Sequence, residues 1–251
     1  MSAALSLRGL SHAYAGVPVL RSIDLDVAPR EVVAVVGPSG AGKTTLFRCL
    51  TRLVRADEGV LEVCGKDLMR LEGGALREAR RDLGLVFQSY NLVRRLTALQ
   101  NVLVGRLAEV PTWRVVLRRF PDAEQQLAAA CLDQVGLLAH AHTRADRLSG
   151  GQQQRVAIAR VLASRARVVL ADEPVASLDP ASAQSVLTAL RSLATDHGKA
   201  VVCSLHQVDL VAGFADRVVG LRDGQIVLDV PASRFDASAA RDLYAPHRAK
   251  V

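Results

Sequence analysis

A glycine-rich loop carries the strongest chemical signal in the sequence. Residues 37–44 follow the P-loop pattern, with the β-branched run Val32–Val36 before them and a predicted helix from Gly42 to about Leu53 after them. Glycines let successive backbone N–H groups turn toward phosphate oxygens, and the helix adds the positive end of its dipole. We therefore expect a nucleotide site made of Gly37, Pro38, Ser39, Gly40, Ala41, Gly42, Lys43, Thr44 and Thr45.

Two side chains of this loop have distinct expected roles. Lys43 should reach the β- and γ-phosphates of ATP, and the Thr44 hydroxyl should ligate Mg²⁺. The alternative is a glycine turn with a chance lysine, which the strand–loop–helix order makes rarer. P-loops serve many functions, so this motif alone names none of them.

A second helix N-terminus suited to an anion lies far along the chain. Ser149 is placed to cap a helix predicted over Gly150–Ala163, and Gly150 and Gly151 leave room for a phosphate to approach the free N–H groups. An ordinary helix start is the alternative.

The pentapeptide Leu148-Ser149-Gly150-Gly151-Gln152 resembles the signature of the ABC ATPase family, and the resemblance extends over about residues 5–245. It implies an α/β fold with a P-loop NTPase core, ATP and Mg²⁺ as ligands, and a head-to-tail homodimer. In such a dimer, the signature of one subunit covers the ATP that the P-loop of the other subunit holds.

Two carboxylates match the family's next motif, at the end of the apolar run Val168–Ala171. The resemblance implies that Asp172 lies on the Mg²⁺ side, acting through water, and that Glu173 is the general base for the attacking water. A strand that ends in a solvated acidic turn is the alternative. Asp179 then matches the family's D-loop at the dimer interface, and it is also a good N-cap for a helix beginning at Pro180.

Three single residues complete the resemblance. His206, after the predicted strand Val201–Leu205, matches the switch histidine that contacts the γ-phosphate. Gln88, after the predicted strand Leu83–Phe87, matches the glutamine that senses Mg²⁺ and the attacking water. Tyr14, in the loop after the first strand, matches the aromatic residue that stacks on adenine. A structural histidine and a tyrosine packed in the β part are the alternatives.

The elements that must position these residues alternate along the chain. The start is β-rich, since Ile23, Leu25 and Val27 alternate with aspartates, and Asp223-Gly224 predicts a late hairpin. Predicted helices over 98–107, 122–135 and 150–163 form a block between strand-rich parts. The expected architecture is α/β with a mainly parallel core, an N-terminal antiparallel β subdomain and a helical insert. We expect one domain over residues 1–245, with the insert at about 89–163 and a tail over 246–251.

Composition supports a globular protein that contains no membrane span. Half of the residues are apolar, 23% are charged and the net charge is +7. No apolar run approaches the roughly 20 residues that a spanning helix needs, and the first residues lack the pattern of a secretory signal. The four cysteines are scattered, which favours reduced, buried side chains over a metal site. We expect a peripheral protein on the cytoplasmic face of the cell (inner) membrane.

Within the family, the chain looks most similar to the ATPase subunit of phosphonate importers. The stretches that carry this similarity are 88–93, 111–114, 144–147, 171–180 and 205–210. The sequence Asp229-Val230-Pro231-Ala232 departs from the usual pattern after the hairpin. Importers of phosphate, phosphite or another solute, lipid or lipoprotein exporters, and ABC ATPases that act on nucleic acid or ribosomes remain the alternatives.

The resemblance also implies partners. These are integral membrane permease subunits and an extracytoplasmic substrate-binding protein, with no direct nucleic acid. We hypothesise that the segment from Tyr90 to about Leu107 receives a short cytoplasmic helix of the permease. The transport path belongs to other chains, so this sequence cannot identify the transported molecule.

Overall fold

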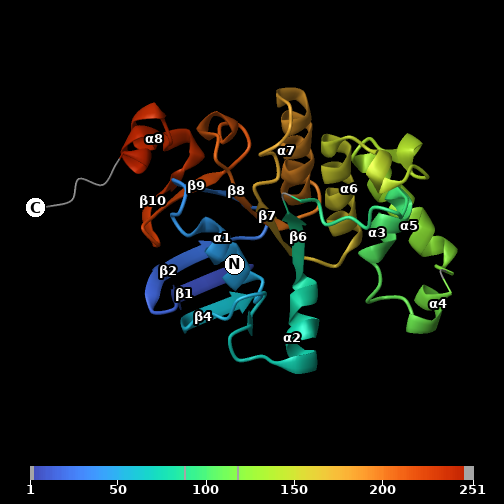
Figure 1. Ribbon diagram of the computed structural model, residues 1–251, viewed down its shortest axis with the longest axis horizontal. Helices are drawn as coiled ribbons and strands as arrows, with labels where there is room; N and C mark the ends of the chain where they lie inside the picture. Colours follow the sequence, from blue (N-terminus) through green and yellow to red (C-terminus); the bar gives the residue numbers. More distant parts are fainter. Residues whose placement is uncertain (1–2, 88, 118, 246–251) are drawn as a thin grey trace, which may run out of the picture.

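The computed structural model describes residues 3–87, 89–117 and 119–245, and two β-sheets organise it (Figure 1). All neighbours in the six-stranded central sheet are parallel except β9 and β10. The carboxyl ends of its parallel strands therefore meet at one edge. In spatial order its strands are β10 (Gln225–Pro231), β9 (Arg217–Arg222), β3 (Val32–Val36), β8 (Ala200–Ser204), β7 (Val168–Asp172) and β6 (Leu83–Phe87).

A four-stranded antiparallel sheet forms the second layer. Its order is β2 (Val17–Val27), β1 (Leu5–Tyr14), β4 (Glu58–Val63) and β5 (Lys66–Asp67). The alternation predicted for β2 is confirmed, because Ile23, Leu25 and Val27 are buried while the aspartates between them are exposed. One face of this sheet thus covers the core and the other faces solvent.

The central sheet is buried on both faces, which explains the continuous apolar run of β3. Val33 and Val35 pack with the antiparallel sheet and helix α1 (Lys43–Leu50), whereas Val32, Ala34 and Val36 pack with the other helices. The helices on this other face are α3 (Ala98–Val104), α5 (Asp122–Gln134), α6 (Gly150–Ala163) and α7 (Pro180–Thr195). The predicted fold class is confirmed: an α/β core, an antiparallel β layer, and helices inserted between β6 and β7.

Several boundaries differ from the prediction. Helix α1 ends at Leu50 rather than near Leu53, because Arg52 takes a left-handed conformation at φ 55°. Helix α3 ends at Val104, three residues early. Three short helices were not predicted: α2 (Gly73–Ala79), α4 (Thr112–Val116) and α8 (Ala237–Tyr244). Single 3₁₀ turns occur at Arg80–Asp82, Leu138–His140, Ala145–Arg147, Val208–Leu210 and Ala232–Arg234.

Other expectations concern the cysteines, the chain end and membrane spans. The cysteines are free, with Cys49, Cys131 and Cys203 buried and Cys64 partly buried. The expected tail, 246–251, lies outside the described residues. Within the part of the chain that the structure describes, no helix has the length and apolarity needed to cross a bilayer.

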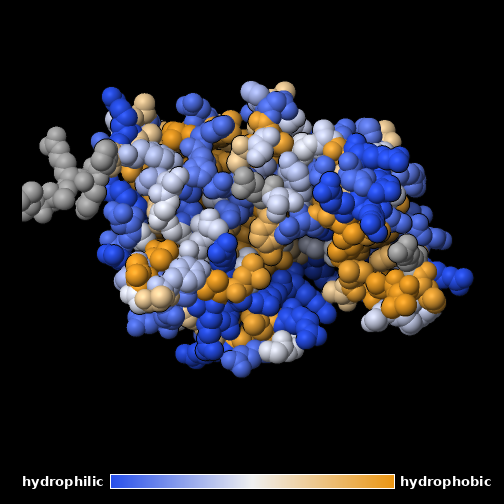
Figure 2. Space-filling view, viewed as in Figure 1, coloured by the Kyte–Doolittle hydropathy of each residue, from blue (hydrophilic) through white to orange (hydrophobic). Residues whose placement is uncertain are grey.

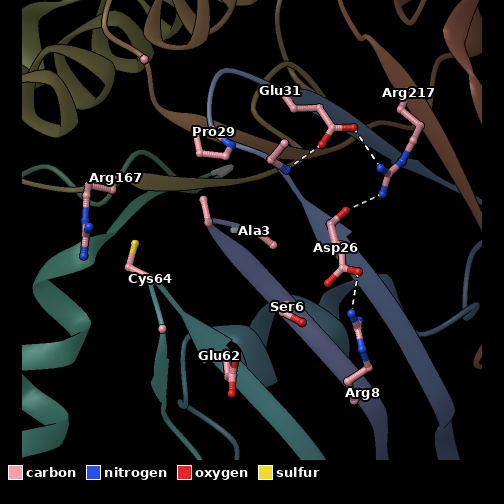
Figure 3. A pocket seen from close by; sticks show the side chains of 14 residues that line it. Ala3, Ser6, Arg8, Asp26, Pro29, Glu31, Glu62, Cys64, Arg167 and Arg217 are labelled. Atoms are coloured by element: carbon pink, nitrogen blue, oxygen red, sulfur yellow. Dashed lines mark hydrogen bonds and ion pairs between the residues drawn. The ribbon is translucent and has the colours of Figure 1, made fainter. Parts of the chain in front are cut away.

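A hollow of about 650 Å³ lies at the amino ends of the parallel strands, where the two sheets meet (Figure 3). A chain of ion pairs lines it. The Arg8 guanidinium pairs with Asp26 at 2.6 Å, and Arg217 of β9 pairs with Glu31 at 2.9 Å. Arg217 also donates to the backbone carbonyl of Asp26 at 2.6 Å. These contacts join the antiparallel sheet to the central sheet, at the edge opposite the P-loop.

Candidate nucleotide site

The P-loop connects β3 to α1 at the carboxyl edge of the central sheet, and its backbone tolerates only glycine at two points. A Cβ on Gly37, at φ 152°, would lie 2.0 Å from the carbonyl oxygen of Leu221. One on Gly42, at φ 103°, would lie 2.9 Å from the carbonyl oxygen of Val19. The neighbouring β9 and β2 thus hold the loop close, and side chains there would displace it.

Lys43 is the buried cation of this loop, with 5% of its surface exposed. Its Nζ donates to the carbonyl oxygens of Gly37 at 2.6 Å and Pro38 at 3.1 Å. A lysine ammonium carries three N–H donors, so one remains for a ligand in the pocket. Burial lowers the pKa of Lys43, while the charges of Glu173 and Asp172 oppose that shift.

The start of helix α1 is open to an anion. Gly42 occupies the N-cap position, and among the residues that the structure describes no side chain caps the first-turn N–H groups. Ser39, Gly40 and Thr44 are exposed around it, and Thr45 is partly buried. Free N–H groups, the helix dipole and a lysine together form a cradle suited to phosphates.

Two carboxylates meet at the end of β7. The Ser204 hydroxyl donates to Asp172 Oδ1 at 2.7 Å and accepts from the backbone N–H of Glu173 at 2.8 Å. Glu173 has a left-handed backbone at φ 48°, and this N–H bond helps to hold it there. Burial raises the pKa of Asp172, the bond from Ser204 lowers it, and the charge of Glu173 raises it again.

Ser204 is a site residue that the sequence analysis missed. It is fully buried at the end of β8, in register with Asp172 of β7. Only knowledge that residues 168–172 pair with residues 200–204 would have pointed to it.

His206 and Glu173 line the same pocket and contact each other, with His206 Nε2 lying 2.6 Å from Glu173 Oε1. The pocket has a volume of about 350 Å³. Tyr14 lies at its rim with 41% of its surface exposed, as the last residue of β1 rather than in the loop after it. The rings of Tyr14 and His12 pack edge to face, with their centroids 4.6 Å apart. The pocket is lined by Tyr14, Val19, Ser39, Gly40, Ala41, Gly42, Lys43, Thr44, Thr45, Glu173 and His206.

The signature residues lie elsewhere. Ser149 caps α6 in a capping box with Gln152, as Ser149 Oγ accepts from the Gln152 N–H at 3.3 Å and Gln152 Oε1 accepts from the Ser149 N–H at 2.9 Å. Gly150 and Gly151 fit closely, since added Cβ atoms would lie 2.7 Å from Tyr90 Oη and 2.8 Å from Ser182 Cβ. None of these four signature residues lines the pocket.

Four other predicted site residues do not line the pocket: Gly37, Pro38, Asp172 and Asp179. Asp179 is exposed and caps α7 by accepting from the Ser182 N–H at 3.0 Å, so its predicted capping role is confirmed. Gln88 lies outside the described residues.

A divalent cation fits the oxygen donors of Thr44, which lines the pocket, and of Asp172, which directly precedes the pocket residue Glu173. Among the residues that the structure covers, no three His, Cys, Asp or Glu side chains gather as a metal-ligand set. Asp172 and Thr44 offer a carboxylate and a hydroxyl, which are the ligand types that Mg²⁺ takes when phosphate oxygens and waters complete its shell.

Comparison with known proteins agrees with this geometry. Residues 20–176 match the family profile described as "ABC transporter". The chain is 50% identical over 241 residues to the hypophosphite import ATP-binding protein HtxD of Stutzerimonas stutzeri, covering 96% of this chain and 71% of that protein. It is 45% identical over 241 residues to the phosphonates import ATP-binding protein PhnC of Lactobacillus johnsonii, covering 96% and 95% of the two chains.

Solved structures show the same architecture. CbiO1 of Clostridium perfringens, part of an ABC transporter complex, matches with a TM-score of 0.81 and 25% identity over 93% of this chain and 90% of that one. A dimeric ATP-binding cassette bound to ADP and Pi after hydrolysis matches with a TM-score of 0.77 and 30% identity, over 92% of this chain and 100% of that one.

Proposed function

The chain belongs to the ABC transporter family of ATP-binding subunits, and from that premise we propose that it hydrolyses ATP to drive import of phosphonates. The pocket supports the first part of this proposal, because it combines an open helix N-terminus with a buried lysine and a Glu–His pair. The relatives support the second part, since those at 42–50% identity are phosphonate or hypophosphite import ATP-binding proteins.

In the proposed ATP complex, the P-loop binds the phosphates. The N–H groups that begin α1 surround them, and the remaining N–H of Lys43 reaches the β- and γ-phosphates. Tyr14 stacks on the adenine from the rim of the pocket. Thr44 and Asp172 would hold Mg²⁺, which neutralises phosphate charge when bound.

Hydrolysis in this scheme uses Glu173 as the general base. Its carboxylate orients a water toward the γ-phosphorus and accepts a proton as the bond to the β–γ bridging oxygen breaks. His206 lies 2.6 Å from that carboxylate and lines the same pocket, so it can hold Glu173 and contact the γ-phosphate. Gln88 remains a prediction for sensing the water.

Two copies are needed to enclose the nucleotide. Ser149 and its neighbours do not line the pocket of their own chain, yet they form a helix N-terminus suited to an anion. A second copy placed head to tail would bring its signature and Asp179 over the ATP, and the cassette with bound ADP and Pi is a dimer. ATP then favours the closed dimer because the open state lacks half of the phosphate ligands.

The permease would dock on the helical insert. We treat residues 1–245 as one ATPase domain, in which the insert over about 89–163 passes the motion of the domain to the permease. An apolar cluster of Trp113, Val116 and Leu117 lies on this insert, with 57%, 74% and 58% of each residue exposed. Figure 2 shows an orange patch over α4, where Val116 and the neighbouring Leu117 are exposed. Exposed arginines at 94 and 95 lie on the segment after β6, within the predicted socket over 90–107.

Such a patch matches a short amphipathic helix of a membrane subunit. Docking there would hold the chain at the cytoplasmic face of the membrane. A permease and an extracytoplasmic binding protein would complete the importer.

The substrate is tested with the reconstituted complex. ATPase activity is measured with the binding protein and, in turn, a phosphonate, phosphite, hypophosphite and phosphate. Preferential stimulation by the phosphonate supports the proposal. Stimulation by hypophosphite alone would favour the function named for the relative that is 50% identical. ATP hydrolysis without response to any of the four would overturn the substrate class but leave the ATPase assignment intact.

A further inference from the structure

The C-terminal helix α8 reaches the first residue of the P-loop through one side chain. The hydroxyl oxygen of Tyr244 accepts a hydrogen bond from the backbone N–H of Gly37 at 3.2 Å. The two residues are 207 positions apart in the sequence, so only the fold brings them together. Gly37 is buried, and an unpaired buried N–H is costly.

Helix α8 is held firmly enough to support this contact. Asp236 caps it by accepting from the N–H groups of Ser238 and Ala239, both at 2.9 Å. Leu243 is buried against Gly220 of β9, and the Arg222 guanidinium donates to the Asp242 carbonyl at 3.0 Å. The helix thus rests on β9, close to the start of the P-loop (Figure 1).

Gly37 in turn determines where the Lys43 ammonium lies. Its carbonyl accepts the 2.6 Å hydrogen bond from Lys43 Nζ, while its N–H is held by Tyr244. The carbonyl of Leu221 blocks any shift of Gly37 toward β9, since even a Cβ would not fit between them. Lys43, Tyr244 and strand β9 therefore fix the position of Gly37. Because Lys43 Nζ is bonded to Gly37, the position of Gly37 sets the direction of the remaining N–H of Lys43.

The Tyr244 hydroxyl suits this role. A phenol is neutral at physiological pH because its ordinary pKa is about 10, and burial raises the pKa of Tyr244 further, which the bond from Gly37 only partly opposes. A neutral phenol keeps an oxygen lone pair for the Gly37 N–H. Phenylalanine at this position would keep the ring and lose only the acceptor.

We propose that Tyr244 is a positioning residue for nucleotide binding, which acts through Gly37 to aim Lys43 at the phosphates. This inference rests on the proposed ATP site. A residue with this role affects the grip on β- and γ-phosphates and leaves the base-stacking contact unchanged. Loss of this residue should weaken the binding of both ATP and ADP. The binding of AMP, which has neither a β- nor a γ-phosphate, should be unaffected.

The test compares three forms of the full chain: wild type, Tyr244→Phe and Arg222→Ala. The control Arg222→Ala removes the polar contact of α8 with β9 but leaves the Gly37–Tyr244 bond in place. Dissociation constants for ATP, ADP and AMP and the melting temperature are measured for each. We expect Tyr244→Phe to raise the dissociation constants of ATP and ADP about five- to tenfold and to leave that of AMP unchanged. Arg222→Ala should lower the melting temperature and leave all three dissociation constants unchanged.

The results separate the possible failures. The inference is overturned if both variants weaken ATP and ADP binding equally, or if Tyr244→Phe weakens the binding of all three nucleotides equally. Either result would make Tyr244 a structural residue. Unchanged ATP and ADP binding in Tyr244→Phe would also overturn it. A wild-type chain that bound none of the nucleotides would contradict the proposed function instead. If Tyr244→Phe folds poorly, Tyr244→Met supplies an apolar side chain without an oxygen, and the same nucleotide pattern is expected.

Discussion

The hydroxyl of Ser204 donates a 2.7 Å hydrogen bond to Asp172, and through the same oxygen it accepts the N–H of Glu173. One buried side chain thus contacts both the carboxylate of Asp172 and the backbone of Glu173 at the end of β7. The same hydroxyl therefore lowers the pKa of Asp172 and bonds to the backbone of the proposed general base.

Replacing Ser204 with alanine should shift the pH dependence of ATP hydrolysis. Burial raises the pKa of Asp172 and the Ser204 hydroxyl lowers it, so the variant leaves the raising effect less opposed. Asp172 must be ionised to help hold Mg²⁺, and therefore the acidic limb of the kcat/KM profile should move to higher pH. The maximal rate should fall about ten- to hundredfold, since a hydrogen bond to a charged group contributes about 1.5–3 kcal/mol.

The control for this variant is Ser204→Thr, which retains a hydroxyl oxygen. Its acidic limb should stay at the wild-type position. A limb that moves to lower pH, or stays fixed, in Ser204→Ala would contradict the assigned coupling.

Gly37 and Gly40 form a matched pair for the P-loop. Alanine at Gly37 would place its Cβ 2.0 Å from a backbone oxygen, whereas a Cβ at Gly40 would meet no atom of the described residues within 4 Å. Gly37→Ala should abolish ATP binding and lower the melting temperature strongly. Gly40→Ala should lower the free energy of unfolding by only about 1–2 kcal/mol, which is the strain of an alanine in a left-handed conformation. Comparable melting temperatures in a calorimeter would show that Gly37 is not confined as described.

His206→Ala should slow hydrolysis while ATP still binds. The variant loses the 2.6 Å contact with Glu173, so the base is less well oriented, and a loss of about 10²–10³ in kcat is expected. Gln207→Ala, at the exposed neighbouring position, serves as the control and should retain wild-type kcat. The prediction fails if single-turnover measurements give His206→Ala the wild-type rate constant.

Charge reversal at Arg94 and Arg95 should weaken assembly with the permease. Both side chains are exposed on the segment that we assign to the docking surface. The double variant Arg94→Glu with Arg95→Glu should reduce co-purification at least tenfold while ATPase activity of the isolated chain is retained. Arg234→Glu with Arg241→Glu changes the net charge equally on the C-terminal part and should assemble normally. Equal recovery of permease with both double variants would exclude the proposed surface.

Local sequence signals predicted much of the fold. The bounds of β3, β6 and α6 agree with the prediction, because β-branched runs, turn residues and the Ser149 cap are local features. The Asp223-Gly224 hairpin is confirmed for the same reason, with both residues at positive φ. The P-loop, Glu173 and His206 were recognised by motif, and the structure brings them to one pocket.

Contacts between distant segments were out of reach. Ser204 depends on the register of β7 with β8, and Tyr244 depends on where α8 lies against β9. Neither is encoded by spacing within a motif. The signature and the P-loop could not be placed together for a different reason, since in the proposed mechanism they meet only between two copies.

The central claim is that ATP joins two copies of this chain through the P-loop of one and the signature of the other. Its most direct test is the molar mass of Glu173→Gln, measured by light scattering with and without ATP, because this variant should bind ATP and hydrolyse it very slowly. We predict a monomer without nucleotide, a dimer with ATP, and a monomer again when Ser149→Arg is added to the same chain. A chain that stays monomeric at saturating ATP, or a dimer that Ser149→Arg leaves intact, would contradict the claim.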